Sequence, residues 1–229
     1  CIYIIDLGSQ YTHLISKRLR LLGYRSEIID QDFTASSLKN PKGLIISGGP
    51  GTNLSGLTNK IFATQLPILG ICLGHQLIST HYGGAVEKKA NTEFGKSNLS
   101  QVKDSILWEG VSQGSQIWMS HFDTVTNIPP DFDIIGQTNN GVVAALQHTK
   151  KSIYTLQFHP EVSDTQDGYH ILLNFAKICK ARRNWSMDNF SLDTIDKIKT
   201  QVGDRKVLLF VSGGIDSTVA FELLNASIG

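Results

Sequence analysis

A cysteine placed between two glycines is the first candidate for chemistry in this sequence. Cys72 lies in GICLG, after the apolar run PILGI and before a segment with helical spacing. The pattern G-x-C-x-G at a strand-to-helix junction predicts a nucleophile elbow, a strained turn that lifts the nucleophile above the sheet edge. The positive end of the following helix favours thiolate over thiol. Most cysteines are small buried hydrophobes, so Cys72 needs a neighbouring base before it can be assigned a role.

The segment QFHPE supplies that base. His159 comes directly after the strand-like run SIYTLQF, and Pro160 favours an extended backbone at the residue before it. In an extended chain, residues i and i+2 point to the same side, so His159 and Glu161 can meet. The histidine can take a proton from the thiol and return it to a leaving amine, while the carboxylate orients the imidazole. We therefore predict nucleophilic acyl transfer by Cys72, His159 and Glu161.

Acyl transfer also needs hydrogen-bond donors for the oxyanion that develops on the substrate. The backbone N–H groups of Leu73 and of Gly49, within SGGPG at 47–51, are the candidates. Removal of one such donor costs about 3 to 4 kcal/mol of barrier. Because glycine lets the backbone come close to a substrate, the glycine segment suits this role.

The elements that must position these residues form an α/β pattern. Short apolar runs read as strands at 1–6, 25–30, 43–48 and 67–71, and the segment 11–23 has helical spacing. The runs are nearly continuous in apolar residues, which is typical of parallel strands covered on both faces. Ligands of such sheets bind beyond the carboxyl ends of the strands, where Cys72 and the glycine segment fall.

Further along the chain the pattern changes twice. Shorter strands with glycine turns fill residues 84–158, which predicts a mixed or antiparallel extension of the sheet, and a helix over 168–183 closes a first domain at 1–183. We expect a linker at 184–190 and the first part of a second α/β domain at 191–229. In this second part an amphipathic segment precedes a buried strand, KVLLFV, a glycine loop and a helix.

Three motifs occur in one order, ISGGPG, GICLGHQ and QFHPE, and together they resemble the class I, triad-type glutamine amidotransferases. The resemblance implies a flavodoxin-like, mainly parallel sheet, with Cys72 forming a glutamyl thioester, His159 as acid and base, and Glu161 as its partner. It also implies that the amino-acid end of glutamine is held by the residues Gln76, Ser120, His121, Phe122 and Asp123. Hydrolysis of glutamine in this family needs no cofactor, and we predict no metal ligands.

The sequence departs from the family pattern near the substrate. Phe122 stands where glycine is usual, CLGHQ and GGPGTNLSG are unusual, and none of these changes touches the predicted triad. Another amidotransferase class uses an N-terminal cysteine as nucleophile. Cys1 opens a core strand, so we expect it to be structural, as we do Cys179 inside a helix.

A second glycine loop follows KVLLFV and opens a helix, so its N–H groups can cradle an anion. It resembles the pyrophosphate loop of N-type ATP pyrophosphatases, which implies ATP and Mg²⁺ as cofactors. The expected ATP-binding residues are Ser212, Gly213, Gly214, Ile215, Asp216, Ser217 and Thr218. Asp216 either helps to place Mg²⁺ or caps the helix.

The two resemblances together imply that ammonia from glutamine aminates xanthosine monophosphate (XMP) activated by ATP, in a homodimer joined through a C-terminal region. Two alternatives stay open. One is an amidotransferase for another acceptor, such as anthranilate or carbamoyl phosphate, and the other is a glutamine-sensing module without turnover.

Composition is consistent with a soluble enzyme. The 229 residues carry a formal net charge of +1, so we expect no general attraction to nucleic acid or to acidic membranes. Three cysteines without C-x-x-C spacing indicate a reducing compartment. Together with the lack of a recognisable leader or of an apolar run of about 20 residues, this predicts a cytoplasmic location.

Overall fold

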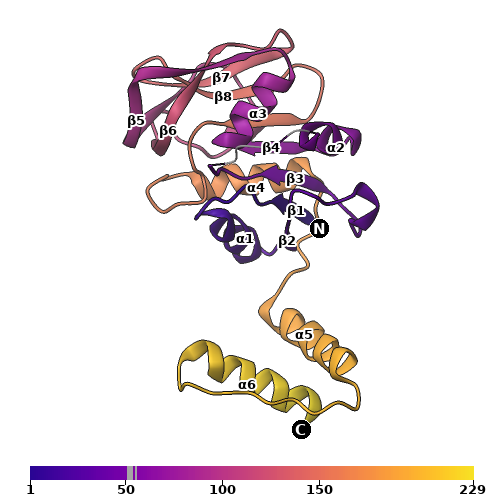
Figure 1. Ribbon diagram of the computed structural model, residues 1–229. Coiled ribbons are helices and arrows are strands. Elements are labelled where there is room, and N and C mark those ends of the chain that lie inside the picture. Colours follow the sequence, from indigo (N-terminus) through magenta and orange to yellow (C-terminus); the bar gives the residue numbers. More distant parts are fainter. Residues whose placement is uncertain (51–53, 55) are drawn as a thin grey trace. The chain divides into compact units, whose positions relative to one another are not determined.

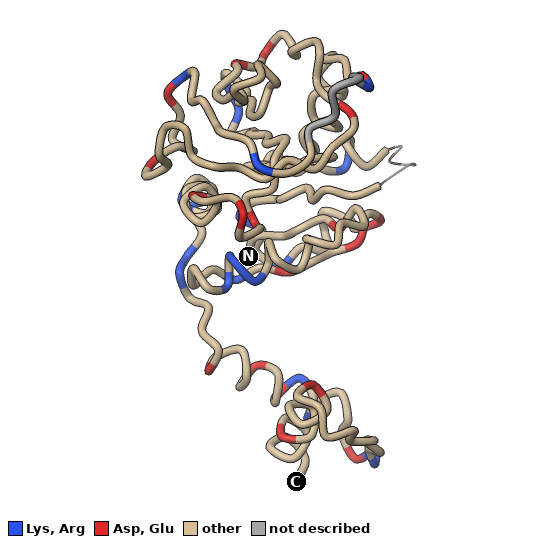
Figure 2. The backbone as a smooth tube through the Cα atoms, turned by 90° about the vertical axis from the view of Figure 1, so that its left-hand side faces the viewer, with Lys and Arg blue, Asp and Glu red and all other residues tan. Residues whose placement is uncertain are grey.

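The computed structural model describes residues 1–50, 54 and 56–229, and it describes no side chains for 89–93. The chain divides into two compact units, Cys1–Arg183 and Asn184–Gly229, each described here by itself. Gly51, part of the predicted glycine segment, and most of the unusual stretch that follows it lie outside the described residues. Both basic and acidic residues are spread over the length of the chain (Figure 2). Within the described residues, no helix is both long and apolar enough to span a bilayer.

The first unit is built on a nine-stranded sheet with the order β2-β1-β3-β4-β9-β8-β7-β5-β6 (Figure 1). The first five strands in this order run parallel and the remaining pairs are antiparallel. The parallel strands are β1 (Ile2–Ile5), β2 (Ser26–Ile29), β3 (Gly43–Ile46), β4 (Ile68–Ile71) and β9 (Ile153–Leu156). The predicted mixed, mainly parallel α/β fold is confirmed.

Helices cover both faces of the parallel strands. On one face lie α1 (Thr12–Leu21) and α4 (Gly168–Ile178), and on the other lie α2 (Leu57–Ala63) and α3 (Leu73–His81) (Figure 1). Along β1, Ile2 and Ile4 belong to one apolar cluster, whereas Tyr3 and Ile5 belong to the other. Burial on both faces explains the continuous apolar runs of the sequence.

The antiparallel extension consists of β5 (Ala85–Gln101), β6 (Gln116–Asn127), β7 (Phe132–Thr138) and β8 (Val143–His148). The sequence predicts two strands, at 86–90 and at 97–102, where the structure has the single strand β5. This strand pairs with β6 through most of its length and with β7 at its end, and its register against β6 shifts between Lys88 and Glu93. Two 3₁₀ turns, Ala35–Ser37 and Ile106–Trp108, complete the unit.

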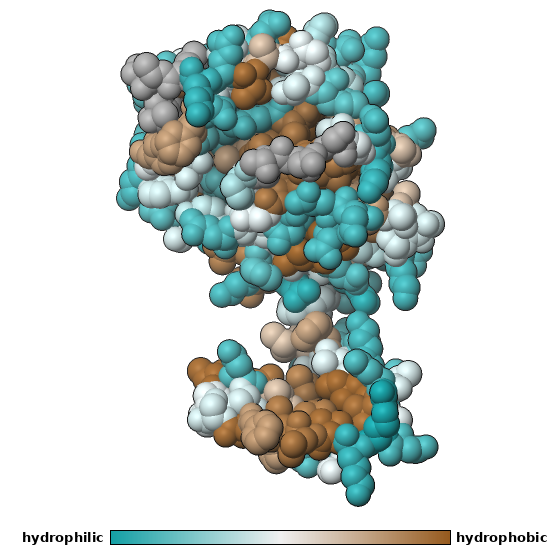
Figure 3. Space-filling model, viewed as in Figure 1, coloured by the Kyte–Doolittle hydropathy of each residue, from teal (hydrophilic) through white to brown (hydrophobic). Residues whose placement is uncertain are grey.

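The second unit contains the helices α5 (Met187–Val202) and α6 (Ile215–Ile228). The helix expected from residue 191 begins earlier, at Met187, because Ser186 caps it by accepting a hydrogen bond from the Asn189 N–H. The prediction of a buried strand at 206–211 is wrong for this unit, since the segment forms no strand. Phe210 is 85% exposed, and apolar side chains gather on the visible face of the unit (Figure 3). A strand needs a hydrogen-bonding partner, and the unit offers none.

Candidate active site

The predicted nucleophile elbow is present at the carboxyl end of β4. Cys72 has φ +53° and ψ −103°, a strained conformation for a residue with a side chain, and it directly precedes α3. Its N–H donates to the Leu156 carbonyl oxygen on the adjacent strand β9, at 2.8 Å. Cys72 is only partly buried, so its thiol can be reached from outside the core.

The glycines on either side of Cys72 are required by close packing. A Cβ at Gly70 would lie 2.6 Å from the carbonyl oxygen of Gly74, and a Cβ at Gly74 would lie 2.5 Å from the carbonyl oxygen of Ile46. Real Cβ atoms do not approach backbone this closely, so α3 could not start so near the sheet with larger residues at these positions. The glycines thus permit the turn that exposes the thiol.

His159 and Glu161 form a buried pair in the segment after β9. The imidazole Nδ1 lies 2.7 Å from Glu161 Oε1, and the two residues are 3% and 1% exposed. The loop is fixed by its backbone, because the His159 N–H donates to the Trp118 carbonyl and the Thr165 hydroxyl donates to the His159 carbonyl. The structure therefore places the histidine and the acid on one side of the chain, as the spacing predicts.

The His159 imidazole also makes a side-chain hydrogen bond with Cys72, so the three predicted triad residues meet. Burial alone lowers the pKa of His159, but the hydrogen bonds and charges of Cys72 and Glu161 outweigh it and raise the pKa to about 10. A histidine that contacts a cysteine on one side and a carboxylate on the other is the arrangement that activates a cysteine nucleophile.

The glycine segment after β3 lies directly against the triad. An ideal Cβ at Gly48 would stand 3.1 Å from His159 Cε1 and 3.4 Å from Cys72 Cβ. Gly49 has φ +153°, and a Cβ there would collide with the Leu7 carbonyl oxygen at 1.9 Å. The predicted oxyanion donors thus come from this segment and from Leu73, the first residue of α3. Their role as donors stays a prediction.

Among the residues predicted to hold glutamine, Ser120 contacts the thiol, while Gln76, His121 and Asp123 contact one another. Cys72 Sγ donates to the Ser120 carbonyl oxygen at 3.7 Å. Gln76 Nε2 donates to the Asp123 carbonyl oxygen at 2.9 Å, and His121 Nδ1 lies 2.9 Å from that oxygen. Gln76 therefore ties α3 to the 120–123 segment of β6. The Phe122 ring is exposed and packs on the exposed Phe94 ring, with centroids 4.9 Å apart.

Sequence reasoning missed two contacts of the triad that come from the region after β1. The Tyr11 ring lies edge-on to the His159 ring, with centroids 5.0 Å apart. Arg18 Nε donates to the Glu161 carbonyl oxygen at 3.2 Å. The only sequence signal for these contacts is that Tyr11 and Arg18 follow the first strand, because the carboxyl ends of parallel strands meet at one sheet edge.

The predicted ATP-binding residues lie in the second unit, at the start of α6. Gly214 precedes the helix, Gly213 has φ +80°, and Asp216 lies in the exposed first turn. The Ser217 hydroxyl donates to the Gly214 carbonyl oxygen. The first turn of a helix leaves N–H groups without partners inside the helix, and the binding of an anion such as pyrophosphate by this loop stays a prediction. Among the described side chains, no cluster of three or more His, Cys, Asp or Glu residues could hold a metal ion.

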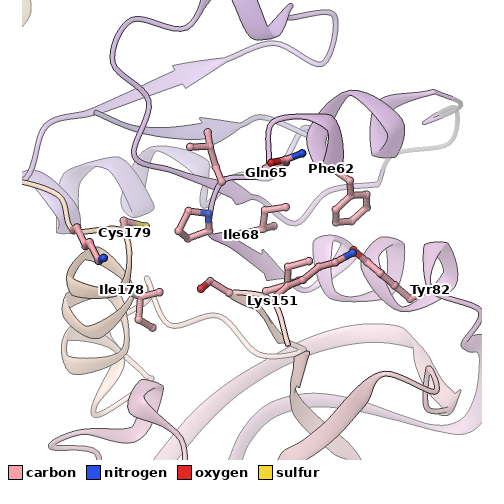
Figure 4. A pocket seen from close by; sticks show the side chains of 12 residues that line it. Phe62, Gln65, Ile68, Tyr82, Lys151, Ile178 and Cys179 are labelled. Atoms are coloured by element: carbon pink, nitrogen blue, oxygen red, sulfur yellow. The ribbon is translucent and has the colours of Figure 1, made fainter. Parts of the chain in front are cut away.

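A cavity of about 670 Å³ lies away from this site, at the opposite ends of β4 and β9 (Figure 4). Its lining includes Ile68, Tyr82 and Lys151, whose ammonium donates to the Tyr82 hydroxyl. Cys179 also lines it, but this thiol is 4% exposed and burial raises its pKa, which disfavours the thiolate. The triad therefore lies at the sheet edge and outside this cavity.

Comparison with known proteins identifies the family of the first unit. The pattern of the family "Glutamine amidotransferase class-I" matches residues 3–179. Proteins named "GMP synthase [glutamine-hydrolyzing]" are similar over the whole chain, at 42% identity in Fusobacterium nucleatum and 45% in Streptococcus pyogenes. The chain spans 46% of the length of these relatives, or about half.

Solved structures show the same fold. A putative GMP synthase subunit from Thermoplasma acidophilum matches with a TM-score of 0.74 and 36% identity, covering 78% of this chain and 93% of that one. A glutamine amidotransferase from Methylobacillus flagellatus matches with a TM-score of 0.58 at 17% identity, covering 77% and 93% of the two chains, and shows the fold alone. The chain belongs to the class I glutamine amidotransferase family.

Proposed function

We propose that this chain hydrolyses glutamine to glutamate and ammonia, and that the ammonia aminates XMP to GMP in the complete enzyme. The observation that carries the first part is the buried His159, which is hydrogen-bonded to Cys72 on one side and to Glu161 on the other. The names of the relatives and the resemblance of the loop at 212–218 to an ATP pyrophosphatase loop support the second part.

The first half-reaction forms an acyl-enzyme. The Cys72 thiolate attacks the side-chain carbonyl carbon of glutamine, and the oxygen takes up negative charge, which the N–H groups of Gly49 and Leu73 stabilise. The His159 imidazolium then gives its proton to the amide nitrogen. The C–N bond breaks, ammonia leaves, and a glutamyl thioester remains on Cys72.

The second half-reaction releases glutamate. His159, now neutral, takes a proton from water, and the water oxygen bonds to the thioester carbon. When the C–S bond breaks, the sulfur leaves as a thiolate beside the imidazolium. Glu161 holds Nδ1 throughout, which keeps the other ring nitrogen directed at the reacting groups.

The amination of XMP involves the second unit together with the part of the longer relatives that this chain does not cover. The backbone of residues 212–218 would hold the pyrophosphate of ATP, and Asp216 is the side chain there that suits Mg²⁺. When bound, ATP supplies the adenylyl group that makes the 2-oxygen of XMP a good leaving group. The overall reaction consumes XMP, ATP, glutamine and water and yields GMP, AMP, pyrophosphate and glutamate. From resemblance alone, we also propose a cytoplasmic homodimer.

The test uses the complete enzyme, with XMP, ATP and either amide-labelled glutamine or ammonia. We expect label in the 2-amino group of GMP, and we expect Cys72→Ala to abolish glutamine-dependent synthesis while ammonia still supports it. Loss of both activities in a folded Cys72→Ala enzyme would contradict the division of labour. Labelled ammonia without GMP would indicate another acceptor, and glutamine binding without hydrolysis would indicate a sensing module.

A further inference from the structure

We propose that Tyr11 is a positioning residue for His159, needed most in the second half-reaction, when the thioester has removed the histidine's contact with the sulfur. This inference rests on the proposed hydrolysis of glutamine. The carrying observation is the edge-on contact of the two rings, with centroids 5.0 Å apart and planes at 71°. Aromatic rings prefer this arrangement over face-to-face stacking.

Tyr11 stands on a firmly held segment. Its N–H donates to the Ser9 hydroxyl at 3.1 Å. Asp6 Oδ1 accepts from the Gly8 N–H and from the Thr12 hydroxyl, both at 2.9 Å, which closes the turn between β1 and α1. Tyr11 is partly buried. A ring on so constrained a turn can restrict its neighbour, because it cannot follow that neighbour's motion.

The helix that follows Tyr11 reinforces the same region. Arg18 on α1 donates from Nε to the Glu161 carbonyl oxygen at 3.2 Å. The region after β1 therefore contacts both members of the acid–base pair, His159 through Tyr11 and Glu161 through Arg18. Neither contact involves a reacting atom, so the role that follows is orientation of the pair.

The need for Tyr11 changes during the reaction. In the free enzyme, the imidazole is held by hydrogen bonds to Cys72 and, through Nδ1, to Glu161. In the acyl-enzyme the sulfur is part of a thioester and has no proton or negative charge to share, so only the bond to Glu161 remains. The imidazole can then swing about that bond unless packing prevents it. Tyr11 supplies that packing while His159 activates water.

A tyrosine elsewhere in the chain provides a matched control. Tyr169 on α4 makes an edge-on contact with His170, with centroids 5.4 Å apart and planes at 69°. This pair is close in geometry to the Tyr11 pair, and neither member contributes to the proposed chemistry. Tyr169→Ala therefore removes a ring contact of similar geometry, on the exposed surface, without touching the triad.

The experiment measures the two half-reactions separately in the complete enzyme. Rapid acid quenching after addition of glutamine, followed by mass spectrometry of the Cys72 peptide, gives the fraction of glutamyl enzyme over time. We expect Tyr11→Ala and Tyr11→Leu to slow thioester hydrolysis about 3- to 10-fold, so that glutamyl enzyme accumulates, with a smaller effect on acylation. Tyr11→Phe, which keeps the ring, and Tyr169→Ala should match the parent enzyme.

The outcomes separate this inference from the function on which it rests. If the parent enzyme forms no adduct at Cys72, the proposed hydrolysis fails. If the parent forms the adduct but folded Tyr11→Ala or Tyr11→Leu hydrolyses it at the parent rate, the role of Tyr11 is refuted. Equal slowing of both half-reactions, or equal slowing by Tyr169→Ala, would also refute it, since general loss of structure would explain the result. Tyr11→Leu decides the matter if Tyr11→Ala does not fold.

Discussion

The glycine next to the triad permits a sharp test of how tightly the site is built. Gly48→Ala adds one methyl group whose carbon would stand 3.1 Å from His159 Cε1 and 3.4 Å from Cys72 Cβ. Carbon atoms in contact prefer separations of about 3.5 to 4.0 Å. The substitution therefore displaces the imidazole by a few tenths of an ångström, and it does so with no positive φ at Gly48 to strain the backbone.

The expected cost follows from how little room His159 has. Its imidazole is hydrogen-bonded to Cys72 and to Glu161, and its ring packs against Tyr11. A misplacement of 1 Å can cost about 100-fold in rate, so a shift of a few tenths predicts a fall of roughly 3- to 10-fold in kcat for glutamine hydrolysis. Since the methyl carbon would be crowded mainly by His159 Cε1, the free energy of unfolding should change by less than about 1.5 kcal/mol.

The assay compares glutamate release with urea unfolding for the parent, Gly48→Ala and a control. Gly136→Ala suits the control because its Cβ would also be crowded, at 2.9 Å from Leu99 Cδ1, on β7 and away from the triad. We expect the control to lose some stability and keep its kcat. A Gly48→Ala enzyme with parental kcat, or one whose loss of kcat is matched by Gly136→Ala, would refute the tight packing of His159.

Three further predictions concern the charge and the supports of the site. Glu161→Gln should lower the pKa of His159 in NMR titration and reduce kcat on the order of 10²- to 10⁴-fold; an unchanged titration would contradict the ion pair. The folded chain keeps the His159 proton up to about pH 10, whereas the unfolded chain releases it near 6.5. The parent's free energy of unfolding, minus that of His159→Gln, should therefore be highest below pH 6.5 and decline as the pH rises to 10. If urea unfolding gives the same difference between the two proteins at every pH, this linkage is excluded. Gln76→Ala removes the hydrogen bond to the Asp123 carbonyl and should raise KM for glutamine about 5-fold in steady-state assays; an unchanged KM would leave this bond without a role.

The parts of the fold that local sequence governs were predictable. The runs that become β1, β3 and β4 are buried on both faces, so their composition identified them, and the glycines around Cys72 identified the turn. The i and i+2 spacing of His159 and Glu161 likewise placed the acid beside the base. These features depend on neighbours within a few residues, which a single sequence displays.

Features that depend on distant partners were not predictable. The contact of Tyr11 with His159 joins residues far apart in the sequence, and only the arrangement of the strands brings them together. The continuity of β5 depends on its pairing with β6. The apolar run at 206–211 has strand composition, yet composition cannot create the neighbouring strand that a sheet requires, and the segment is irregular here.

In the proposed reaction one thiol, Cys72, is activated by His159 and Glu161 to attack the side-chain carbonyl of glutamine. An electrophilic glutamine analogue that alkylates an activated thiol tests it most directly, with the labelled residue identified by peptide mass spectrometry. We expect a single label on Cys72, which is lost in Cys72→Ala and forms far more slowly in His159→Gln and Glu161→Gln. Labelling of Cys1 or Cys179, or labelling of Cys72 at the parental rate in both of the latter variants, would contradict it.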